Sequence, residues 1–451
     1  MDPEDWAVSF DTEMKILIVS FWFPPSNVVG AIRVGKLARY LDRRGHDLRV
    51  LTADIGGDRS LPLEIPEEQV IYTNYENHED WLTTVVRPFL RRPAIALGAR
   101  GELSPVDGGT SSKSAWESLR RHYYGLLHIP DLRRNWIKTA IPAGRQLMKE
   151  WKPDIIFASA PPITGLIIST RLSRAFDVPW IADFRDLWVD SPYYDEPGWR
   201  RCVDVVWERS IVRSAAALVT VSPNWAEQLG RRYGETAEVV LNGYAEEDFP
   251  QPVPQVRQGE VLTIRYTGSI YPGFRDPSAI FAAIGLLPDS LRNRVMVEFF
   301  GDAGDEVRAL AAKHGIRDRI VVSPPVPYRR ALELQMKADI LLLLQWSDKR
   351  DEGNLPGKIF EYLYARRPIL LIGYEHGVAA RLIRERGAGL VSNAPERIRD
   401  QLQAWIEDKK ADRLNRLDAS VSQGLSREDQ FRKLEHVFTK VLNQRRGGIE
   451  T

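Results

Sequence analysis

Short apolar runs alternate with amphipathic segments along most of the chain. KILIVSF (15–21), DLRVLTA (47–53) and PDIIFAS (153–159) are examples of the apolar runs. Continuous apolar runs of this length are typical of strands that are buried on both faces of a parallel sheet. The segments between them carry apolar residues at three- and four-residue spacing, which predicts helices that cover such a sheet. The alternation therefore predicts an α/β fold with parallel sheets.

The alternation stops at the proline-rich polar stretch EEDFPQPVPQVRQGE (246–260) and restarts at LTIRYTG (262–268). This stretch is interpreted as a linker between two Rossmann-like domains. Because parallel sheets bind ligands at the carboxyl ends of their strands, two such sheets predict a cleft between the domains. The predicted parts are a disordered tail (1–13), an N-terminal domain (14–245), the linker (246–260), a C-terminal domain (261–425) and a C-terminal helix (426–451) that can cross back to the N-terminal domain.

An insertion with segregated charge is predicted at about residues 55–147. Residues 50–86 hold eight Asp and Glu against one Arg, whereas residues 87–149 hold twelve Lys and Arg against four Asp and Glu. Basic residues interleaved with aromatic ones suit an interfacial helix on an anionic membrane surface. A solvated helical cap with its apolar face on the core is the alternative. The apolar side chains of the basic part include Trp116, Tyr123, Tyr124, Leu126, Leu127, Trp136 and Ile137.

Composition excludes several classes of function. The formal net charge of +1 argues against a chain-wide nucleic-acid-binding surface. Cys202 is the only cysteine, which excludes a disulfide framework and a cysteine metal site. Because it stands in the helical pattern RRCVDVVWERSI, we expect Cys202 to be a buried structural residue. The seven histidines show no metal-ligand spacing, so neither a metal nor another cofactor is expected.

The sequence also bears on localisation. No apolar run reaches the roughly 18 residues that a membrane span needs. The acidic start MDPEDWAVSFDTE (1–13) lacks the apolar region of a secretory signal. We therefore expect a cytoplasmic protein, which would be peripheral at the inner face of the cytoplasmic membrane if the basic part of the insertion binds lipid.

The first strand-to-helix turn contains GAIRVGKL (30–37), a near match to the phosphate-binding loop G-x-x-x-x-G-K-[ST]. Leu37 stands where that loop needs Ser or Thr to hold magnesium, so a P-loop nucleoside triphosphatase is rejected. What remains is a loop at a helix N-terminus that can contact an anion or a sugar. Gly30 and Arg33 are its candidate ligand contacts, and solvated charges on an amphipathic helix are the alternative.

A second group of candidates follows the apolar strand PWIADF (179–184). Asp183, Arg185 and Asp186 stand at its carboxyl end, and Trp188 comes next. Charged side chains at this edge of a sheet indicate a binding cleft. A structural alternative is an Arg185–Asp186 pair that locks the loop.

The C-terminal domain carries a lysine in the first turn of the helix GKIFEYLYARR (357–367). A cation at the positive end of a helix is unfavourable unless an anion lies with it. Glu361 lies one turn beyond Lys358 on the same face. Gly357 and Lys358 can thus hold a diphosphate while Glu361 accepts the hydroxyls of a ribose. An i,i+3 salt bridge without a ligand is the alternative.

The stretch YTGSIYPGFRDP (266–277) supplies further candidates at the same sheet edge. Gly268 ends a strand, Ser269 follows it, and Arg275 precedes the next helix. Arg275 can approach the diphosphate from this neighbouring loop, because guanidinium groups suit phosphate oxygens.

These features resemble the retaining GT-B glycosyltransferases of family four, over most of the chain from KILIVSFWFPP to RRPILLIG. That family carries E-x7-E before an A-x-G-x-P motif and an apolar strand. Glu361 matches the second glutamate and EYLYARRPIL fits the motif and strand after it, whereas Gly353 stands in place of the first glutamate. Arg185 and Asp186 align with an HD motif of the family, and LNGYAEEDF resembles its link between domains. ADFRDLW and GKIFEYL resemble a subgroup that acts on bacterial surface polysaccharide and includes amino-deoxysugar transferases.

The resemblance implies a GT-B fold, in which two Rossmann-like domains with parallel sheets face a central cleft. It implies transfer of a hexosyl or amino-deoxysugar group from a nucleotide-diphosphate sugar to an acceptor hydroxyl with retention, in polysaccharide or glycolipid biosynthesis. The partners would be the nucleotide-sugar, a saccharide or lipid-linked acceptor bound by the N-terminal domain, and an anionic membrane surface, with no nucleic acid.

A GT-B-fold sugar-nucleotide epimerase remains an alternative, as does a non-catalytic nucleotide-sugar-binding protein, which Gly353 makes conceivable. The resemblance also distributes roles over the candidate residues, with Ser269 and Arg275 at the positions of the family's phosphate-binding Arg and Lys. The implied catalytic residues are Arg185, Asp186, Arg275 and Lys358; the donor-binding residues are Gly30, Arg33, Gly268, Ser269, Arg275, Gly357, Lys358 and Glu361; the acceptor-binding residues are Asp183 and Trp188.

Overall fold

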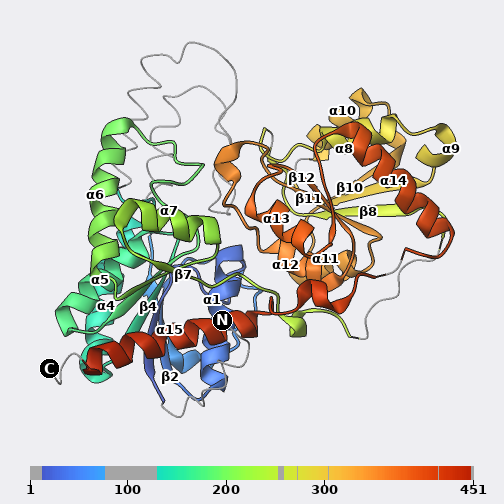
Figure 1. Ribbon diagram of the computed structural model, residues 1–451. Coiled ribbons are helices and arrows are strands. Elements are labelled where there is room, and N and C mark those ends of the chain that lie inside the picture. Colours follow the sequence, from blue (N-terminus) through green and yellow to red (C-terminus); the bar gives the residue numbers. More distant parts are fainter. Residues whose placement is uncertain are drawn as a thin grey trace.

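The computed structural model describes residues 13–76, 129–251, 259–271, 273–302, 304–414 and 416–447. Within them the chain forms two α/β domains, each built on one parallel sheet (Figure 1). The strand order is β3-β2-β1-β4-β5-β6-β7 in the N-terminal sheet and β10-β9-β8-β11-β12-β13 in the C-terminal sheet. The two parallel sheets predicted from the alternation of apolar runs are confirmed.

The N-terminal domain places helices on both faces of its sheet. Its strands are β1 (Lys15–Val19), β2 (Asp47–Asp54), β3 (Val70–Asn74), β4 (Ile155–Ala160), β5 (Trp180–Phe184), β6 (Ala217–Thr220) and β7 (Ala237–Val239). Its helices are α1 (Val29–Arg43), α4 (Ile137–Glu150), α5 (Thr164–Phe176), α6 (Gly198–Ser214) and α7 (Pro223–Tyr233), to which the C-terminal helix α15 (Arg427–Gly447) is added.

The C-terminal domain repeats this plan. Its strands are β8 (Leu262–Thr267), β9 (Val295–Phe300), β10 (Ile320–Ser323), β11 (Ile340–Leu344), β12 (Ile369–Ile372) and β13 (Gly389–Val391). Its helices are α8 (Ser278–Gly285), α9 (Asp289–Arg292), α10 (Gly304–Lys313), α11 (Tyr328–Met336), α12 (Lys358–Ala365), α13 (Val378–Glu385) and α14 (Pro395–Lys410).

Strand β1 shows why the apolar runs are continuous. Ile16 and Ile18 belong to the buried cluster on one face of the sheet, whereas Leu17 and Val19 belong to the cluster on the other face. Successive side chains of a strand point to opposite faces, so a sheet covered on both sides needs an apolar residue at every position.

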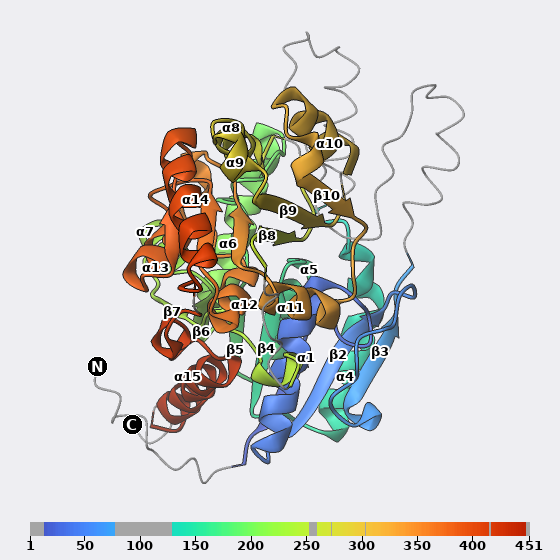
Figure 2. The ribbon, with the colours of Figure 1, turned by 90° about the vertical axis from the view of Figure 1, so that its right-hand side faces the viewer.

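The C-terminal helix α15 packs on the N-terminal domain although it follows the C-terminal one (Figures 1 and 2). Phe438 lies with its ring centroid 5.7 Å from that of Phe157 on β4. Glu435 is buried and lies 3.0 Å from the ring nitrogen Nε2 of His46. Apolar packing and this polar contact together fix the end of the chain to the first domain.

In the part of the chain that the structure describes, two crossings between the domains run side by side. Tyr244 and Ser426 form an isolated parallel bridge, and the backbone N–H of Arg427 donates to the carbonyl of Tyr244 at 2.7 Å. Gly243 has a φ of +64°, and a Cβ there would lie 2.8 Å from the backbone nitrogen of Arg427. Glycine is therefore required at this crossing. We call residues 242–245 and 425–427 together the hinge.

The predicted insertion at 55–147 is too wide. Strand β3 and helix α4 lie inside that range, yet β3 pairs with β2 and α4 packs on the N-terminal core. Trp136 is buried and its indole N–H donates to Thr73 Oγ1 at 2.7 Å, so it is no interfacial residue. Residues 77–128, which hold Trp116 and the Tyr-Leu part of the basic stretch, are outside the described residues. None of the helices in the described ranges is long and apolar enough to cross a bilayer.

The prediction that Cys202 is buried is wrong, because the side chain is exposed on α6. This helix turns an unusual face inward: Arg200, Asp204 and Glu208 are buried, whereas Trp207 is 38% exposed. Arg200 and Asp204 pair at 2.7 Å inside the domain. The polar residues therefore occupy the inner face, which an apolar periodicity does not reveal.

Candidate functional site

In both sheets the strand order reverses beside the first strand of the domain, between β1 and β4 and between β8 and β11. Open parallel sheets bind ligands outside the carboxyl ends of the strands at such a reversal. The candidate residues predicted from the sequence stand in loops and helix starts at these two edges.

Lys358 is the first residue of α12, and its ammonium lies 4.4 Å from the ring centroid of Tyr266 on β8. Gly268, which ends β8, has a φ of +139°, and a Cβ there would collide with the same ammonium. Glycine is needed for both reasons. The structure thus brings Gly357, Lys358 and Gly268 together at the reversal point of the C-terminal sheet.

Glu361 lies one turn further along α12. Its Oε2 accepts a hydrogen bond from Gln335 Nε2 at 3.0 Å. Burial raises the pKa of the Glu361 carboxyl, and the positive charges of Arg427 and Lys358 act in the opposite direction. Arg427 belongs to the hinge, so Glu361 lies between the first turn of α12 and the crossing of the chain.

Arg275 and Ser269 lie in the loop after β8. Arg275 donates from NH1 to the carbonyl of Ser269 at 3.0 Å, and its guanidinium stacks 4.5 Å from the ring centroid of Tyr271. Ser269 Oγ donates to Asp302 Oδ2 at 3.0 Å, which ties this loop to the loop after β9. Arg275 is therefore held by its own loop, on the same Ser269 carbonyl that accepts a hydrogen bond from the Tyr266 hydroxyl at 2.8 Å.

A buried carboxylate near Arg275 went unnoticed in the sequence. Asp351 is 3% exposed and accepts hydrogen bonds from the Asn354 amide at 3.1 Å and from the Tyr193 hydroxyl at 3.2 Å. Burial raises the pKa of Asp351 to about 6, although the positive charge of Arg275 lowers it. Tyr193 comes from the N-terminal domain, so this contact joins the two domains.

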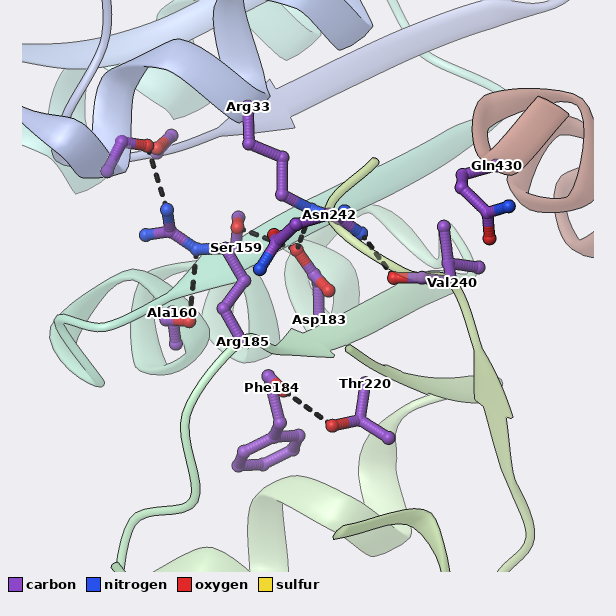
Figure 3. A network of polar contacts seen from close by, with 12 residues as sticks. Arg33, Ser159, Ala160, Asp183, Phe184, Arg185, Thr220, Val240, Asn242 and Gln430 are labelled. Atoms are coloured by element: carbon purple, nitrogen blue, oxygen red, sulfur yellow. Dashed lines mark hydrogen bonds and ion pairs between the residues drawn. The ribbon is translucent and has the colours of Figure 1, made fainter. Parts of the chain in front are cut away.

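In the N-terminal domain Arg33 and Asp183 form a buried pair, with Nε and Oδ2 3.8 Å apart (Figure 3). Arg33 also donates to the carbonyls of Leu241 at 2.7 Å and Val240 at 3.0 Å. Asp183 accepts from Ser159 at 2.7 Å, and its other oxygen has no hydrogen-bond partner within the described part of the chain. Burial lowers the pKa of Arg33. The pair therefore braces the sheet against the segment that leads to the hinge.

Arg185 connects three loops at the carboxyl edge of the same sheet. Its guanidinium donates to the carbonyl of Ala160 at 3.3 Å (Figure 3). It also donates to the carbonyls of Gly30 at 2.8 Å and Pro161 at 2.9 Å. Burial lowers the pKa of Arg185, whereas the negative charges of Asp183 and Asp186 raise it. Arg185 thus holds these loops together, and it does so by hydrogen bonds to their backbone carbonyls.

Two of the predicted acceptor contacts are interior residues. Asp183 is fully buried, and Trp188 is 8% exposed and packs in the N-terminal core. Neither side chain can touch an acceptor in this conformation. Asp186 is exposed, so it is the predicted carboxylate of this edge that solvent and ligands reach.

The structure thus separates the predicted residues into groups. Lys358, Gly357, Gly268 and Glu361 gather around one point, and Arg275 is joined to it through the Ser269 carbonyl, to which Tyr266 also donates. Arg33, Asp183 and Trp188 lie inside the N-terminal domain. Within the described ranges no group of three or more His, Cys, Asp or Glu side chains is arranged to hold a metal ion.

Several residues around the site were missed: Tyr193, Phe274, Trp346, Asp351, Gln335 and Arg427. The segment SPYY (191–194) follows the second candidate group along the chain, and no role was predicted for Tyr193. Asp351 stands among charged loop residues and Arg427 opens a distant helix. No local spacing pointed to either, because the partners that bring them to the site, Tyr193 for Asp351 and Tyr244 for Arg427, are distant in the sequence.

Comparison with known proteins agrees with this arrangement. Residues 30–245, within the N-terminal domain, match the family described as Glycosyl transferase 4-like domain. A D-inositol 3-phosphate glycosyltransferase of Xylanimonas cellulosilytica is 30% identical over 153 residues, which is 30% of this chain and 37% of that protein. The chain thus matches well under half the length of this relative.

Solved structures resemble the chain along almost its whole length. The Anabaena HepE protein in complex with UDP and glucose superposes with a TM-score of 0.59 at 12% identity, covering 95% of this chain and 100% of that one. The lipopolysaccharide outer core galactosyltransferase WaaB in its apo form gives a TM-score of 0.54 at 12% identity with the same coverage. At such identities the likeness shows the fold, and the fold is GT-B: two parallel-sheet α/β domains.

Proposed function

We propose that the protein is a glycosyltransferase that moves a sugar from a nucleotide-diphosphate donor to an acceptor hydroxyl. The observation that carries the proposal is the position of Lys358 in the first turn of α12, beside Gly268 at the end of β8. A helix N-terminus together with an ammonium group forms a site for phosphate oxygens. The matching family segment at 30–245 and the UDP complex of a protein with the same fold support this reading.

In the proposed complex the diphosphate lies at the first turn of α12, in contact with Gly357, Lys358 and Gly268. Glu361 accepts the ribose hydroxyls from one turn further along. Its half-buried position helps here, because a carboxylate that is partly shielded from water forms stronger hydrogen bonds to ligand hydroxyls. Lys358 and Arg275 stabilise the negative charge that develops on the departing diphosphate, which is the main electrostatic task of this reaction.

The N-terminal domain supplies the acceptor side. Asp186 is exposed at the carboxyl edge of its sheet and orients the acceptor hydroxyl or the sugar. Arg185 keeps the loops around Asp186 in place through its carbonyl contacts. In this proposal Arg33 and Asp183 act as a brace, and Gly30 provides the carbonyl that Arg185 binds.

The finer parts of the proposal follow from the family resemblance. The transferred group is a hexosyl or amino-deoxysugar residue, the anomeric configuration is retained, and the product belongs to a polysaccharide or glycolipid. Of the basic stretch 87–149, the part at 87–128, which is outside the described residues, brings the protein to an anionic membrane surface, where a lipid-linked acceptor would be found. Salt-sensitive cosedimentation of the full chain with vesicles that contain phosphatidylglycerol, and none with phosphatidylcholine vesicles, tests this last point.

The function is tested first by calorimetry of the full-length protein against UDP, GDP, ADP and dTDP. We expect one of them to bind, and binding of none of the four would overturn the donor site. The sugar nucleotide of the binding base is then incubated with the enzyme, with and without saccharide and lipid-linked acceptors. Appearance of free nucleoside diphosphate together with a glycosylated acceptor is the expected result.

The same incubation separates the alternatives. An epimerase would convert the donor into an isomeric sugar nucleotide without an acceptor. A binding protein would leave the donor intact under all conditions. Nuclear magnetic resonance of the product's anomeric proton decides whether the configuration is retained.

A further inference from the structure

Gly353 lies in the connection between β11 and α12 and touches the other domain. A Cβ added at Gly353 would lie 2.5 Å from both Cδ1 and Nε1 of Trp225 and 2.8 Å from Oδ1 of Asn224. Both residues belong to the first turn of α7 in the N-terminal domain. Trp225 is 6% exposed and its ring packs in the N-terminal core, so it cannot simply swing away. Any side chain at position 353 would push the two domains apart.

A second contact between the domains is centred on Tyr193. Its ring lies 5.6 Å from Phe274 and 6.3 Å from Trp346, measured between centroids, and the latter two rings are 4.8 Å apart. Its hydroxyl donates to the buried carboxylate of Asp351. Tyr193 follows β5, whereas the other three residues follow β8 and β11. The loops at the carboxyl edges of the two sheets therefore meet here.

The proposed donor site is built on the same loops that carry these contacts. Gly268 and Arg275 follow β8 next to Phe274, and Lys358 opens α12 after the loop that holds Trp346 and Asp351. Glu361 lies one turn further along α12, where the positive charge of Arg427 in the hinge acts to lower the pKa of its carboxyl. Within the described residues the chain passes from one domain to the other at the hinge, so rotation about the hinge would separate Tyr193 and Trp225 from their partners.

We propose that Tyr193 and Trp225 form a latch by which the N-terminal domain closes over the diphosphate end of the donor site, with Gly353 as the notch that admits Trp225. Contacts of this kind are few and partly polar, as expected of an interface that opens and closes. Donor entry requires the latch to open, and its closure places Asp186 and Arg275 on either side of the donor. The identity of the enclosed ligand rests on the proposed function. The contacts of Tyr193 and Trp225 that form the latch do not depend on it.

The domain arrangement can be followed with two labels on the full-length protein. Cys202 is the only cysteine and is exposed on α6, and Lys313 is exposed at the end of α10. A Lys313→Cys variant labelled at both positions reports the separation of the domains by single-molecule energy transfer. Without added ligand we expect a population of high transfer efficiency that corresponds to the closed form.

The decisive variant is Gly353→Ala in this labelled background. We expect the high-efficiency population to be lost or strongly reduced, because the added methyl group meets the indole ring. Gly198→Ala is the matched control, since nothing lies within 4 Å of a Cβ at that position of α6. Gly198→Ala should leave the distribution unchanged. A closed population that survives in Gly353→Ala overturns the notch.

A compensating change tests direct contact. Trp225→Phe shortens the ring that meets position 353, so Trp225→Phe combined with Gly353→Ala should recover the closed population that Gly353→Ala alone loses. Tyr193→Ala provides an independent arm if Gly353→Ala does not fold, and it should also shift the distribution to lower transfer efficiency. Wild-type behaviour of Tyr193→Ala would refute the latch.

Addition of UDP allows the latch and the proposed function to be tested separately. If UDP binds, we expect it to raise the closed fraction of the wild-type protein but not that of Gly353→Ala. If no nucleoside diphosphate binds at all, the donor site is wrong, yet the difference between Gly353→Ala and Gly198→Ala in the free protein still decides the latch.

Discussion

The ammonium of Lys358 lies 4.4 Å from the ring centroid of Tyr266, at the start of a helix and at the end of a parallel strand. The ring face attracts the cation by about 0.5–1 kcal/mol at a partly exposed site. The positive end of the helix acts against it. We expect a phosphate group bound here to interact favourably with both the ammonium and the helix N-terminus, so the Lys358–Tyr266 pair lies at the anion-binding end of the proposed donor site.

Lys358→Ala should weaken the binding of nucleoside diphosphate and of inorganic pyrophosphate by about 10- to 100-fold, since a charge-assisted hydrogen bond contributes about 1.5–3 kcal/mol. Calorimetry measures both ligands. Lys313→Ala removes an exposed lysine of α10 far from the site and serves as the control. Equal affinities in wild type and Lys358→Ala would contradict the site.

Glu361→Gln should weaken the binding of a nucleoside diphosphate by about tenfold, because a carboxylate that accepts ribose hydroxyls forms stronger hydrogen bonds than a neutral amide. Inorganic pyrophosphate lacks a ribose, so its affinity should stay the same. Competition calorimetry with the two ligands makes the comparison within one protein. A loss of pyrophosphate affinity equal to that of the nucleotide would mean that Glu361 acts only by holding α12 in place.

Arg33→Met should destabilise the protein by about 3–5 kcal/mol, because it leaves Asp183 buried without its cation. Denaturant unfolding monitors this loss. Arg43→Met, at the exposed end of the same helix, should change stability by no more than about 0.5 kcal/mol. Nucleoside diphosphate affinity of the folded Arg33→Met protein should be unchanged. If Arg33→Met instead lost nucleotide affinity but kept the stability of the wild type, Arg33 would be a donor-binding residue.

Asp351→Asn should change how stability depends on pH. The folded-state pKa of Asp351 is about 6 against an ordinary 3.8, so the folded state holds this proton more tightly than the unfolded state. The stabilisation is fully present below pH 3.8 and is lost as the pH rises through 6. The stability of the wild type relative to Asp351→Asn should therefore fall by about 2.4 kcal/mol between pH 4 and 7.

Asp348→Asn is the control for this pH experiment. Asp348 is in the same loop, and its hydrogen bonds to Arg350 lower the pKa of the carboxyl to about 2. It stays ionised between pH 4 and 7, so its stability difference from the wild type should be constant there. If the stability difference between the wild type and Asp351→Asn were also constant between pH 4 and 7, Asp351 would not be held in a buried position.

Sugar transfer should proceed at the same rate with EDTA and with added magnesium, because Lys358 and Arg275 supply the positive charge at the leaving diphosphate. Arg275→Ala should lower kcat by about 100-fold or more, in the range observed when one electrostatic stabiliser of a transition state is removed. Loss of activity in EDTA that magnesium restores would assign this task to a metal ion instead.

Local patterns in the sequence identified the elements and part of the site. Leu17 and Val19 point to one face of β1 and Ile16 and Ile18 to the other, so an apolar run was enough to predict a strand covered on both sides. Lys358 and Glu361 lie within one helical turn, and their spacing alone placed them on one face. The position of Lys358 at the edge of the sheet was also predictable, because a parallel sheet gathers the loops after its strands at one edge.

The inward-facing polar residues could not be predicted in this way. Asp183, Arg33 and Trp188 stand where a cleft was expected, yet their partners are buried backbone carbonyls, each other and the core. Whether a charged group at a strand end faces solvent or the interior depends on which distant segment covers it. The segment at 240–241 that covers Arg33 follows it by some two hundred residues.

The sequence by itself determined what depends on neighbours along the chain: the alternation of strands and helices, the two domains, and the cation at the start of α12. Tertiary structure alone decided the contacts between the domains. Gly353 looked like a missing glutamate, but it leaves room for Trp225, and Tyr193 finds Asp351 across the same boundary. Such pairs are separated by more than a hundred residues, so shape and burial select them, and no periodicity in the sequence records them.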